Sequence, residues 1–232
     1  KIFYVPATLS FQLVLEAETL IDDFLKEVGK ARYIISDDEF SKPKRVFDFA
    51  NQYMGMDSKI YVTFGRGCDP VGNPVDDDGV SLDPKGRQVD LSRYVISGGE
   101  PVSMPGRDRE YTAEVGEHIK TVFTKDNVVQ ATNVTARVVF DALRLENPST
   151  DLMRLLRLGG DDDNFELITI YRQMEVMLTE LRKLADRGEI RLGRVVQSGR
   201  ADDVVADALR HFAIYHSKAA MLRRGDRLFI GD

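Results

Sequence analysis

The 232-residue chain has little of the material from which several common sites are built. It contains one cysteine, Cys68, and three histidines, His118, His211 and His216. A single cysteine excludes an internal disulfide and a thiolate-rich metal site, and three histidines leave little for a multi-histidine metal centre. The 32 basic residues do not outnumber the 38 acidic ones, and the net charge is −6. That balance argues against a protein that binds nucleic acid through a general basic field.

Long uncharged runs are also missing. The longest candidate, residues 2–15, is too short to span a bilayer and contains Pro6 and Gln12. No basic segment with a small-residue cleavage site indicates a signal peptide. Both ends of the chain lie beside apolar runs, so we expect the chain to be a piece of a longer protein.

The composition that is present, 43% hydrophobic and 30% charged, is typical of a globular protein. Residues 2–9 are rich in β-branched and aromatic types and predict a buried strand, and residues 59–65 predict a second strand. Between them, amphipathic spacing predicts helices over residues 11–28 and 43–55. This order predicts an α/β fold.

Residues 66–109 differ in kind, because prolines, glycines and aspartates alternate with regularly spaced apolar residues. The similar stretches 72–76 and 86–90 predict two similar turns in an ordered, hairpin-like insertion. The run Asp76-Asp77-Asp78-Gly79 does not fit a calcium-binding EF-hand loop, because Pro74 and Lys85 would occupy ligand positions. We therefore interpret it as a solvated turn.

The rest of the chain is mainly helical by pattern. Helices are predicted over residues 108–123, 128–145, 151–158, 165–187 and 201–217, with a final strand at 227–230. The break at Asn147-Pro148 divides the chain into an α/β domain, residues 1–147 with the 66–109 insertion, and a helical sub-domain, residues 148–232.

Three groups of residues carry weak chemical signals. Cys68 lies next to Asp69, which disfavours the thiolate that a nucleophile needs. His211 and His216 are five residues apart and cannot share a ligand on one helical face. The C-terminal stretch is locally basic and could meet phospholipid headgroups, although a solvated face is the simpler interpretation; its arginines are Arg194, Arg200, Arg210, Arg223, Arg224 and Arg227.

Residues 5–16 read Val-Pro-Ala-Thr-Leu-Ser-Phe-Gln-Leu-Val-Leu-Glu. They resemble the fourth sequence block of the glycerol-3-phosphate acyltransferase family in its long bacterial form. The residues Val5, Pro6, Ser10, Val14 and Glu16 match, whereas Phe11 and Gln12 stand where the family usually has tyrosine and an acid. The strand at 59–65, the pair Asp69-Pro70 and the stretch 127–132 are also similar to the family.

The family's histidine and aspartate, spaced His-x-x-x-x-Asp, and its arginine-containing phosphate block lie N-terminal to this block. The fifth residues after the three histidines are Phe123, His216 and Met221, and none is an aspartate. The resemblance therefore implies that this chain contains no catalytic residue, that the catalytic pair lies upstream, and that the isolated chain is inactive.

The resemblance implies acyl transfer from acyl-CoA or acyl carrier protein to the sn-1 hydroxyl of glycerol 3-phosphate, without a cofactor. It places Val5, Pro6, Ser10 and Glu16 at the substrate-binding site. The chain would form the second half of the acyltransferase α/β domain, followed by the helical sub-domain. It would work together with the N-terminal remainder of the same protein, at the cytoplasmic face of a membrane. Nucleic acid is not expected as a partner.

Dihydroxyacetone phosphate and lysophosphatidate remain open as acceptors. A different class of function also remains open, a non-catalytic module that docks on a membrane surface, on acyl carrier protein or on another subunit.

Overall fold

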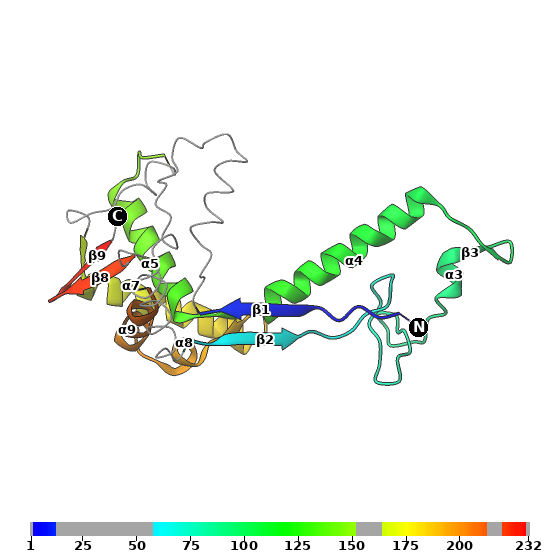
Figure 1. Ribbon diagram of the computed structural model, residues 1–232, viewed down its shortest axis with the longest axis horizontal. Helices are drawn as coiled ribbons and strands as arrows, with labels where there is room; N and C mark the ends of the chain where they lie inside the picture. The colour runs from blue at the N-terminus through cyan, green and yellow to red at the C-terminus, as the bar shows by residue number, and fades with distance from the viewer. Residues whose placement is uncertain (1, 13–57, 152–163, 213–219, 231–232) are drawn as a thin grey trace, which may run out of the picture. The chain divides into compact units, whose positions relative to one another are not determined.

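The computed structural model describes residues 2–12, 58–151, 164–212 and 220–230 (Figure 1). These residues mix helices and strands, which is compatible with an α/β class. The helix predicted at 11–28 is described only at Phe11 and Gln12, and there it is wrong, because Phe11 belongs to a strand, Ala7–Phe11. The rest of this helix, the one predicted at 43–55 and most of the one at 151–158 lie outside the described residues.

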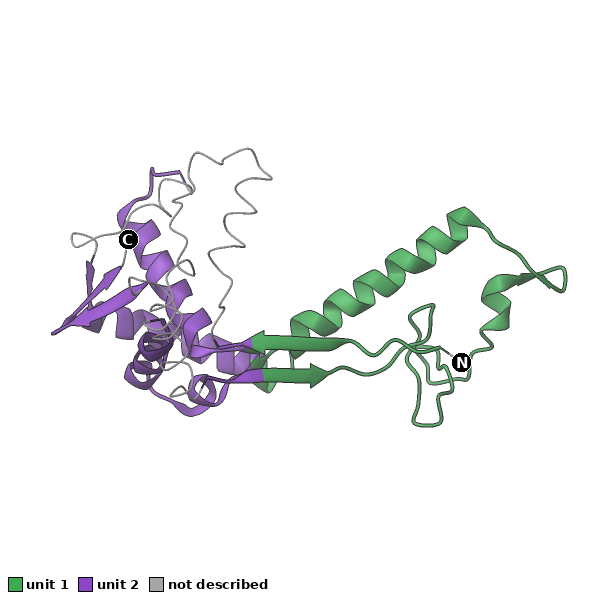
Figure 2. Cartoon of the chain, viewed as in Figure 1, with its two compact units in different colours: residues 1–10, 61–128, 185–191 green, residues 11–60, 129–184, 192–232 purple. Residues whose placement is uncertain are grey.

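The chain forms two compact units that alternate along the sequence (Figure 2). Unit 1 comprises residues 1–10, 61–128 and 185–191, and unit 2 comprises residues 11–60, 129–184 and 192–232. The predicted division at residue 147 does not coincide with either unit, because residues 129–147 group with the helical C-terminal part.

Two antiparallel strands, β1 (Ala7–Phe11) and β2 (Ile60–Phe64), form the first sheet. The Gly65 N–H donates to the Pro6 carbonyl at 2.8 Å, and the Gln12 N–H donates to the Lys59 carbonyl at 3.1 Å. These two bonds set a register in which Leu9 lies opposite Val62. The prediction of a strand at 59–65 is confirmed.

The prediction of a buried strand at residues 2–9 is wrong in two respects. The strand begins at Ala7, and its apolar side chains face outward: Leu9 is 54% exposed, with Val62 and Phe64 on β2 at 52% and 71%. Ser10 on the alternate face is buried. The face that carries Ser10 is therefore the packed one, and the Ser10 hydroxyl finds hydrogen-bond partners there.

A seven-residue repeat organises the insertion. An aspartate begins each turn and a glycine follows three residues later with a left-handed φ of +91°, +70° or +75° at Gly72, Gly79 and Gly86. In each turn the Oδ1 atom of the aspartate accepts the N–H groups two and four residues further along; the aspartates are Asp69, Asp76 and Asp83. Between turns, the N–H groups of Val75, Leu82 and Val89 donate to carbonyls eight residues earlier. The path is hairpin-like, as predicted, but it contains three equivalent turns where the pattern indicated two.

Acid is expected to weaken these turns. Hydrogen bonds from the backbone N–H and the guanidinium of Arg87 lower the pKa of Asp83, and those from the hydroxyl and N–H of Ser92 lower the pKa of Asp90. A carboxyl whose pKa is lower in the folded state stabilises the fold above its unfolded pKa, about 4, and loses this effect as the pH falls further.

The double variant Asp83→Asn/Asp90→Asn should therefore lose less stability than the wild type between pH 5 and pH 3 in urea titrations followed by circular dichroism. Equal losses in the two proteins would show that these carboxylates do not contribute.

The remainder of unit 1 is a short helix α3 (Ser92–Val95), a small hairpin of β3 (Ile96–Ser97) and β4 (Glu100–Pro101), and the long helix α4 (Pro105–Asp126). Pro105 lies in the first turn of α4, where its missing N–H costs no helical hydrogen bond. Val115 and Asp126 are buried, and most of the helix surface is exposed. Near its C-terminal end the helix leaves no room for a side chain at Gly65, since an added Cβ would lie 2.4 Å from Val122.

Unit 2 is built on helices α5 (Ala131–Glu146), α7 (Leu167–Asp186), α8 (Arg194–Ser198) and α9 (Ala201–Phe212). Helix α5 packs against α9. A three-stranded antiparallel sheet of β6 (Asn164–Glu166), β9 (Arg227–Ile230) and β8 (Met221–Arg224) completes the core, and β5 (Val128–Val129) pairs with β7 (Arg191–Leu192). The most deeply buried side chains are Ile170, Met174, Leu178, Val196, Val204 and Leu228.

The pattern-based helices of this part agree with the structure except at two starts. The helix predicted from Val128 begins at Ala131, because Val128 and Val129 form β5. Phe165 was expected in a helix, but it lies in β6 opposite Leu228 of the confirmed terminal strand. The helix begins at Leu167, directly after this pairing. The predicted helix at 201–217 is described as far as Phe212.

Candidate functional site

The residues that the acyltransferase resemblance places at a substrate site fall on two faces of one extended segment. Val5 is 56% exposed, whereas Pro6 and Ser10 are buried. Glu16 lies outside the described residues. The structure therefore brings Pro6 and Ser10 to one side of the segment and leaves Val5 on the other.

The Ser10 hydroxyl is fully engaged inside unit 1. It donates to the side-chain oxygen of Asn127 at 2.8 Å and accepts the N–H of Val128 at 2.9 Å. A hydroxyl with both partners satisfied fixes the start of β5 beside β1. Its direct effect in this structure is to position the segment that follows Asn127.

Gln12 forms a buried polar cluster with residues distant in sequence, all within unit 2. Its amide nitrogen donates to the Asp207 carboxylate at 2.8 Å, and its amide oxygen accepts the Lys59 N–H at 3.1 Å. The Thr132 hydroxyl donates to the Gln12 backbone carbonyl at 2.9 Å. This cluster, Gln12, Lys59, Thr132 and Asp207, has no spacing signal in the sequence, because Gln12 and Asp207 are 195 residues apart.

His211 belongs to the same buried region. Its Nδ1 atom lies 2.7 Å from the Asp207 carbonyl oxygen, 3.3 Å from the Gln12 amide nitrogen and 3.9 Å from the Asp207 carboxylate. A protonated Nδ1 donates to this carbonyl oxygen, whereas an unprotonated Nδ1 accepts from the Gln12 amide, so the role of this nitrogen depends on the tautomer. Of the two C-terminal histidines, His211 is the one that packs, and His216 lies outside the described residues.

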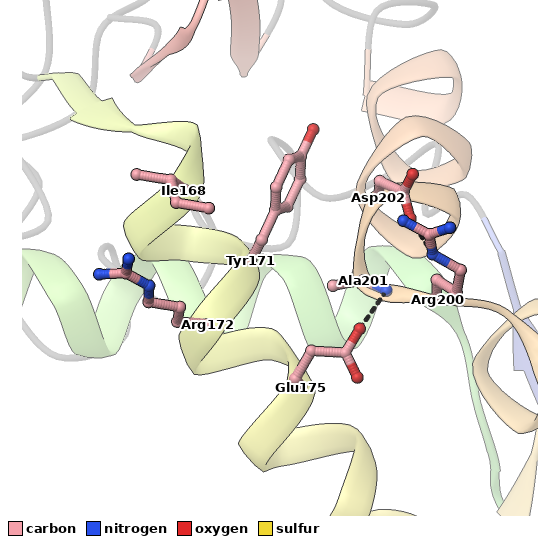
Figure 3. Close-up of a pocket in the computed structure, with 7 residues that line it drawn as sticks. All are labelled: Ile168, Tyr171, Arg172, Glu175, Arg200, Ala201 and Asp202. Carbon is pink, nitrogen blue, oxygen red and sulfur yellow. Dashed lines mark hydrogen bonds and ion pairs between the residues drawn. The ribbon is translucent and has the colours of Figure 1, made fainter.

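A groove of about 300 Å³ lies between α7 and the start of α9 (Figure 3). The Glu175 carboxylate accepts the Ala201 N–H at 2.9 Å and so satisfies one free amide of α9. Arg200 pairs with Asp202 at 3.3 Å. The lining also contains Ile168, Tyr171 and Arg172, so that it carries two guanidinium groups and two carboxylates in all. No serine, cysteine or histidine is among the described residues that line this groove.

Cys68 lacks the environment of a nucleophile. Its side chain is fully buried, and burial, with a smaller contribution from the negative charge of Asp69, raises the pKa of the thiol. The thiol is therefore protonated at neutral pH.

We expect Cys68 to react with a disulfide reagent at pH 8 only after denaturation. Because burial is the larger cause, Asp69→Asn should change this reactivity less than any variant that opens the fold. Fast reaction of the native protein, measured by release of the coloured thiolate, would contradict this interpretation.

Among the described residues, no group of three or more histidine, cysteine, aspartate or glutamate side chains is placed to hold a metal ion. None of the described helices combines the length and the apolar character needed to cross a bilayer. No protein-family model, curated protein or solved structure matches this chain.

Proposed function

We propose that this chain is part of a glycerol-3-phosphate 1-O-acyltransferase-like enzyme of phospholipid synthesis. One observation carries the proposal: three stretches that resemble this family, residues 5–16, 59–65 and 127–132, are joined directly by hydrogen bonds. In unit 1, Pro6 accepts from Gly65, and Ser10 bonds to Asn127 and Val128.

In unit 2, Gln12 bonds to Lys59 and Thr132. Stretches separated by 47 to 120 residues thus interact directly within each unit, which supports a common origin for their sequence patterns.

In this proposal the chain supplies the scaffold, and the catalytic base lies in an upstream segment. A histidine would take the proton of the sn-1 hydroxyl as its oxygen attacks the thioester carbonyl, and the thiolate of coenzyme A or of acyl carrier protein would leave. Pro6 and Ser10 would hold the strand beside the substrate, and Val5 would face it. The enzyme would act at the cytoplasmic face of a membrane.

The test is an acyl-transfer assay on the protein encoded by the longer reading frame. Radiolabelled acyl-CoA and acyl carrier protein are offered with glycerol 3-phosphate, dihydroxyacetone phosphate or lysophosphatidate. We expect transfer to glycerol 3-phosphate and none by the 232-residue chain alone. Transfer by the isolated chain would contradict the assignment of the base, and failure with all three acceptors would contradict the function.

A non-catalytic membrane module is the second candidate. Leu222, Arg224 and Arg227 are exposed together on the β6–β9–β8 sheet, and this feature supports a membrane contact equally in both candidates.

A further inference from the structure

The two strands β1 and β2 (Figure 1) present an uncharged apolar face to solvent. The hydrogen bonds at the two ends of this sheet fix a register in which three side-chain pairs share the face. The pairs are Ala7–Phe64, Leu9–Val62 and Phe11–Ile60. The five large side chains are between 43% and 71% exposed. This outer face, formed by the six paired side chains, contains no group that can form an ion pair or a side-chain hydrogen bond.

The outer face is large enough to form an interface. An aromatic side chain has a surface of about 150–250 Å² and an aliphatic one somewhat less, so five half-exposed side chains leave roughly 500 Å² of apolar surface in water. The largest apolar patch of an ordinary monomer is about 300–600 Å², and such a patch is often functional. Two copies that cover this face would bury about 1,000 Å² in total, the lower limit for a specific complex.

A lipid bilayer does not fit this face. The hydrogen bonds Gly65–Pro6 and Gln12–Lys59 alternate along the sheet so that Leu9 and Val62 form a non-hydrogen-bonded pair. Their N–H and C=O groups point to the two edges of the sheet, which has no third strand beside them in the described part of the chain. Hydrocarbon would leave these groups without partners, whereas a second protein layer over the face keeps both edges in water.

The outer face is complementary to itself. A charged partner gains nothing from an uncharged face, whereas a second copy brings an apolar face of equal size. In a twofold stack whose axis runs across the strands, Ala7 of one copy lies over Phe11 of the other. When the axis runs along the strands, Ala7 lies over Phe64 of the other copy. Either axis therefore sets the smallest side chain of the face against an aromatic ring.

We propose that two copies of this chain associate through their outer faces, stacked about a twofold axis. The stack removes the exposed apolar side chains from water and needs no charge on either copy. Because the buried area lies at the lower limit for a specific complex, we expect a reversible dimer with a dissociation constant of about 1–100 μM. The dimer goes beyond the proposed acyltransferase function and does not depend on it.

Sedimentation velocity of the 232-residue chain, at about 1 to 500 μM, tests the proposal. We expect a monomer at the lowest concentrations and a dimer at the highest. Phe64→Asp should raise the dissociation constant by at least about tenfold, because the stack would bury an unpaired carboxylate. Val176→Asp is the matched control, since Val176 is 68% exposed on α7, and it should leave the dimer unchanged.

Ala7→Phe separates the stack from non-specific apolar adhesion. The substitution adds apolar surface to the outer face, so non-specific adhesion would become stronger. In the stack it fills the space that receives an aromatic ring of the second copy, and the dissociation constant should rise about tenfold. Circular dichroism verifies that each variant is folded.

Cross-linking locates the contact. The one native cysteine, Cys68, is fully buried, so Val62→Cys introduces a single accessible thiol at the centre of the outer face. A short bis-maleimide should link two copies of this variant and should not link two copies of Val176→Cys.

A monomer throughout the concentration range would overturn the proposal, and so would growth beyond a dimer, which edge-to-edge pairing of strands would cause. Equal effects of Phe64→Asp and Val176→Asp, tighter association of Ala7→Phe, or equal cross-linking of the two cysteine variants would also overturn it. None of these results bears on acyl transfer, which the assay described above tests separately.

Discussion

Replacing Gln12 with glutamate is expected to lower the free energy of unfolding by about 3–5 kcal/mol at pH 7. The substitution hardly changes the volume of the side chain, but it replaces the amide donor that lies 2.8 Å from the Asp207 carboxylate with a second carboxylate. Both side chains are buried, so water cannot screen the repulsion. Urea unfolding followed by circular dichroism measures the loss.

A double-mutant cycle with Asp207→Asn separates this repulsion from other effects. In the Asp207→Asn background, glutamate at position 12 again faces a donor, so its effect should be much smaller. The loss caused by Gln12→Glu alone should also shrink between pH 7 and pH 5, because the repulsion raises the pKa of one carboxyl in the folded state. Equal effects in the two backgrounds would contradict the assignment of the Gln12–Asp207 hydrogen bond.

Asp69→Ala is expected to destabilise unit 1 by about 2–4 kcal/mol. The Asp69 side chain is fully buried and accepts three hydrogen bonds, from the N–H groups of Val71 and Asn73 and from the Asn73 side-chain amide. Alanine leaves these donors without an acceptor. Asp69→Asn retains an acceptor oxygen and should lose less.

The repeat supplies the control for this prediction. Asp83 makes the same two backbone hydrogen bonds in the third turn, but its surroundings are exposed to water. Asp83→Ala should therefore be much milder than Asp69→Ala, since water replaces the lost acceptor. Similar losses at both positions would show that turn geometry, and not burial, determines the contribution of these aspartates.

Local patterns predicted much of the secondary structure. Helix α7 and the strands β2 and β9 follow from the spacing of apolar residues, which needs no knowledge of distant contacts. The sequence pattern indicated only two of the three Asp-x-x-Gly turns, because only the stretches 72–76 and 86–90 resemble each other beyond the aspartate and the glycine. The middle turn, at Asp76, differs in composition but has the same backbone hydrogen bonds.

The orientation of β1 could not be predicted in this way. Because side chains alternate along a strand, Leu9 and Ser10 must lie on different faces of the sheet. The alternation does not show which of the two faces is packed. Ser10 is buried because Asn127, which is 117 residues away, accepts its hydrogen bond. The same reason applies to the Gln12 cluster and to β6, whose pairing with β9 joins residues more than sixty positions apart.

The most direct test of the proposed function is to determine the reading frame upstream of Lys1 and to assay its product. We expect a His-x-x-x-x-Asp sequence and an arginine-containing block within about 150–300 residues, a domain-sized stretch. The longer protein should acylate glycerol 3-phosphate, and replacement of that histidine with alanine should abolish the activity. A frame without this pair, or full activity after the histidine is replaced, would contradict the acyltransferase assignment.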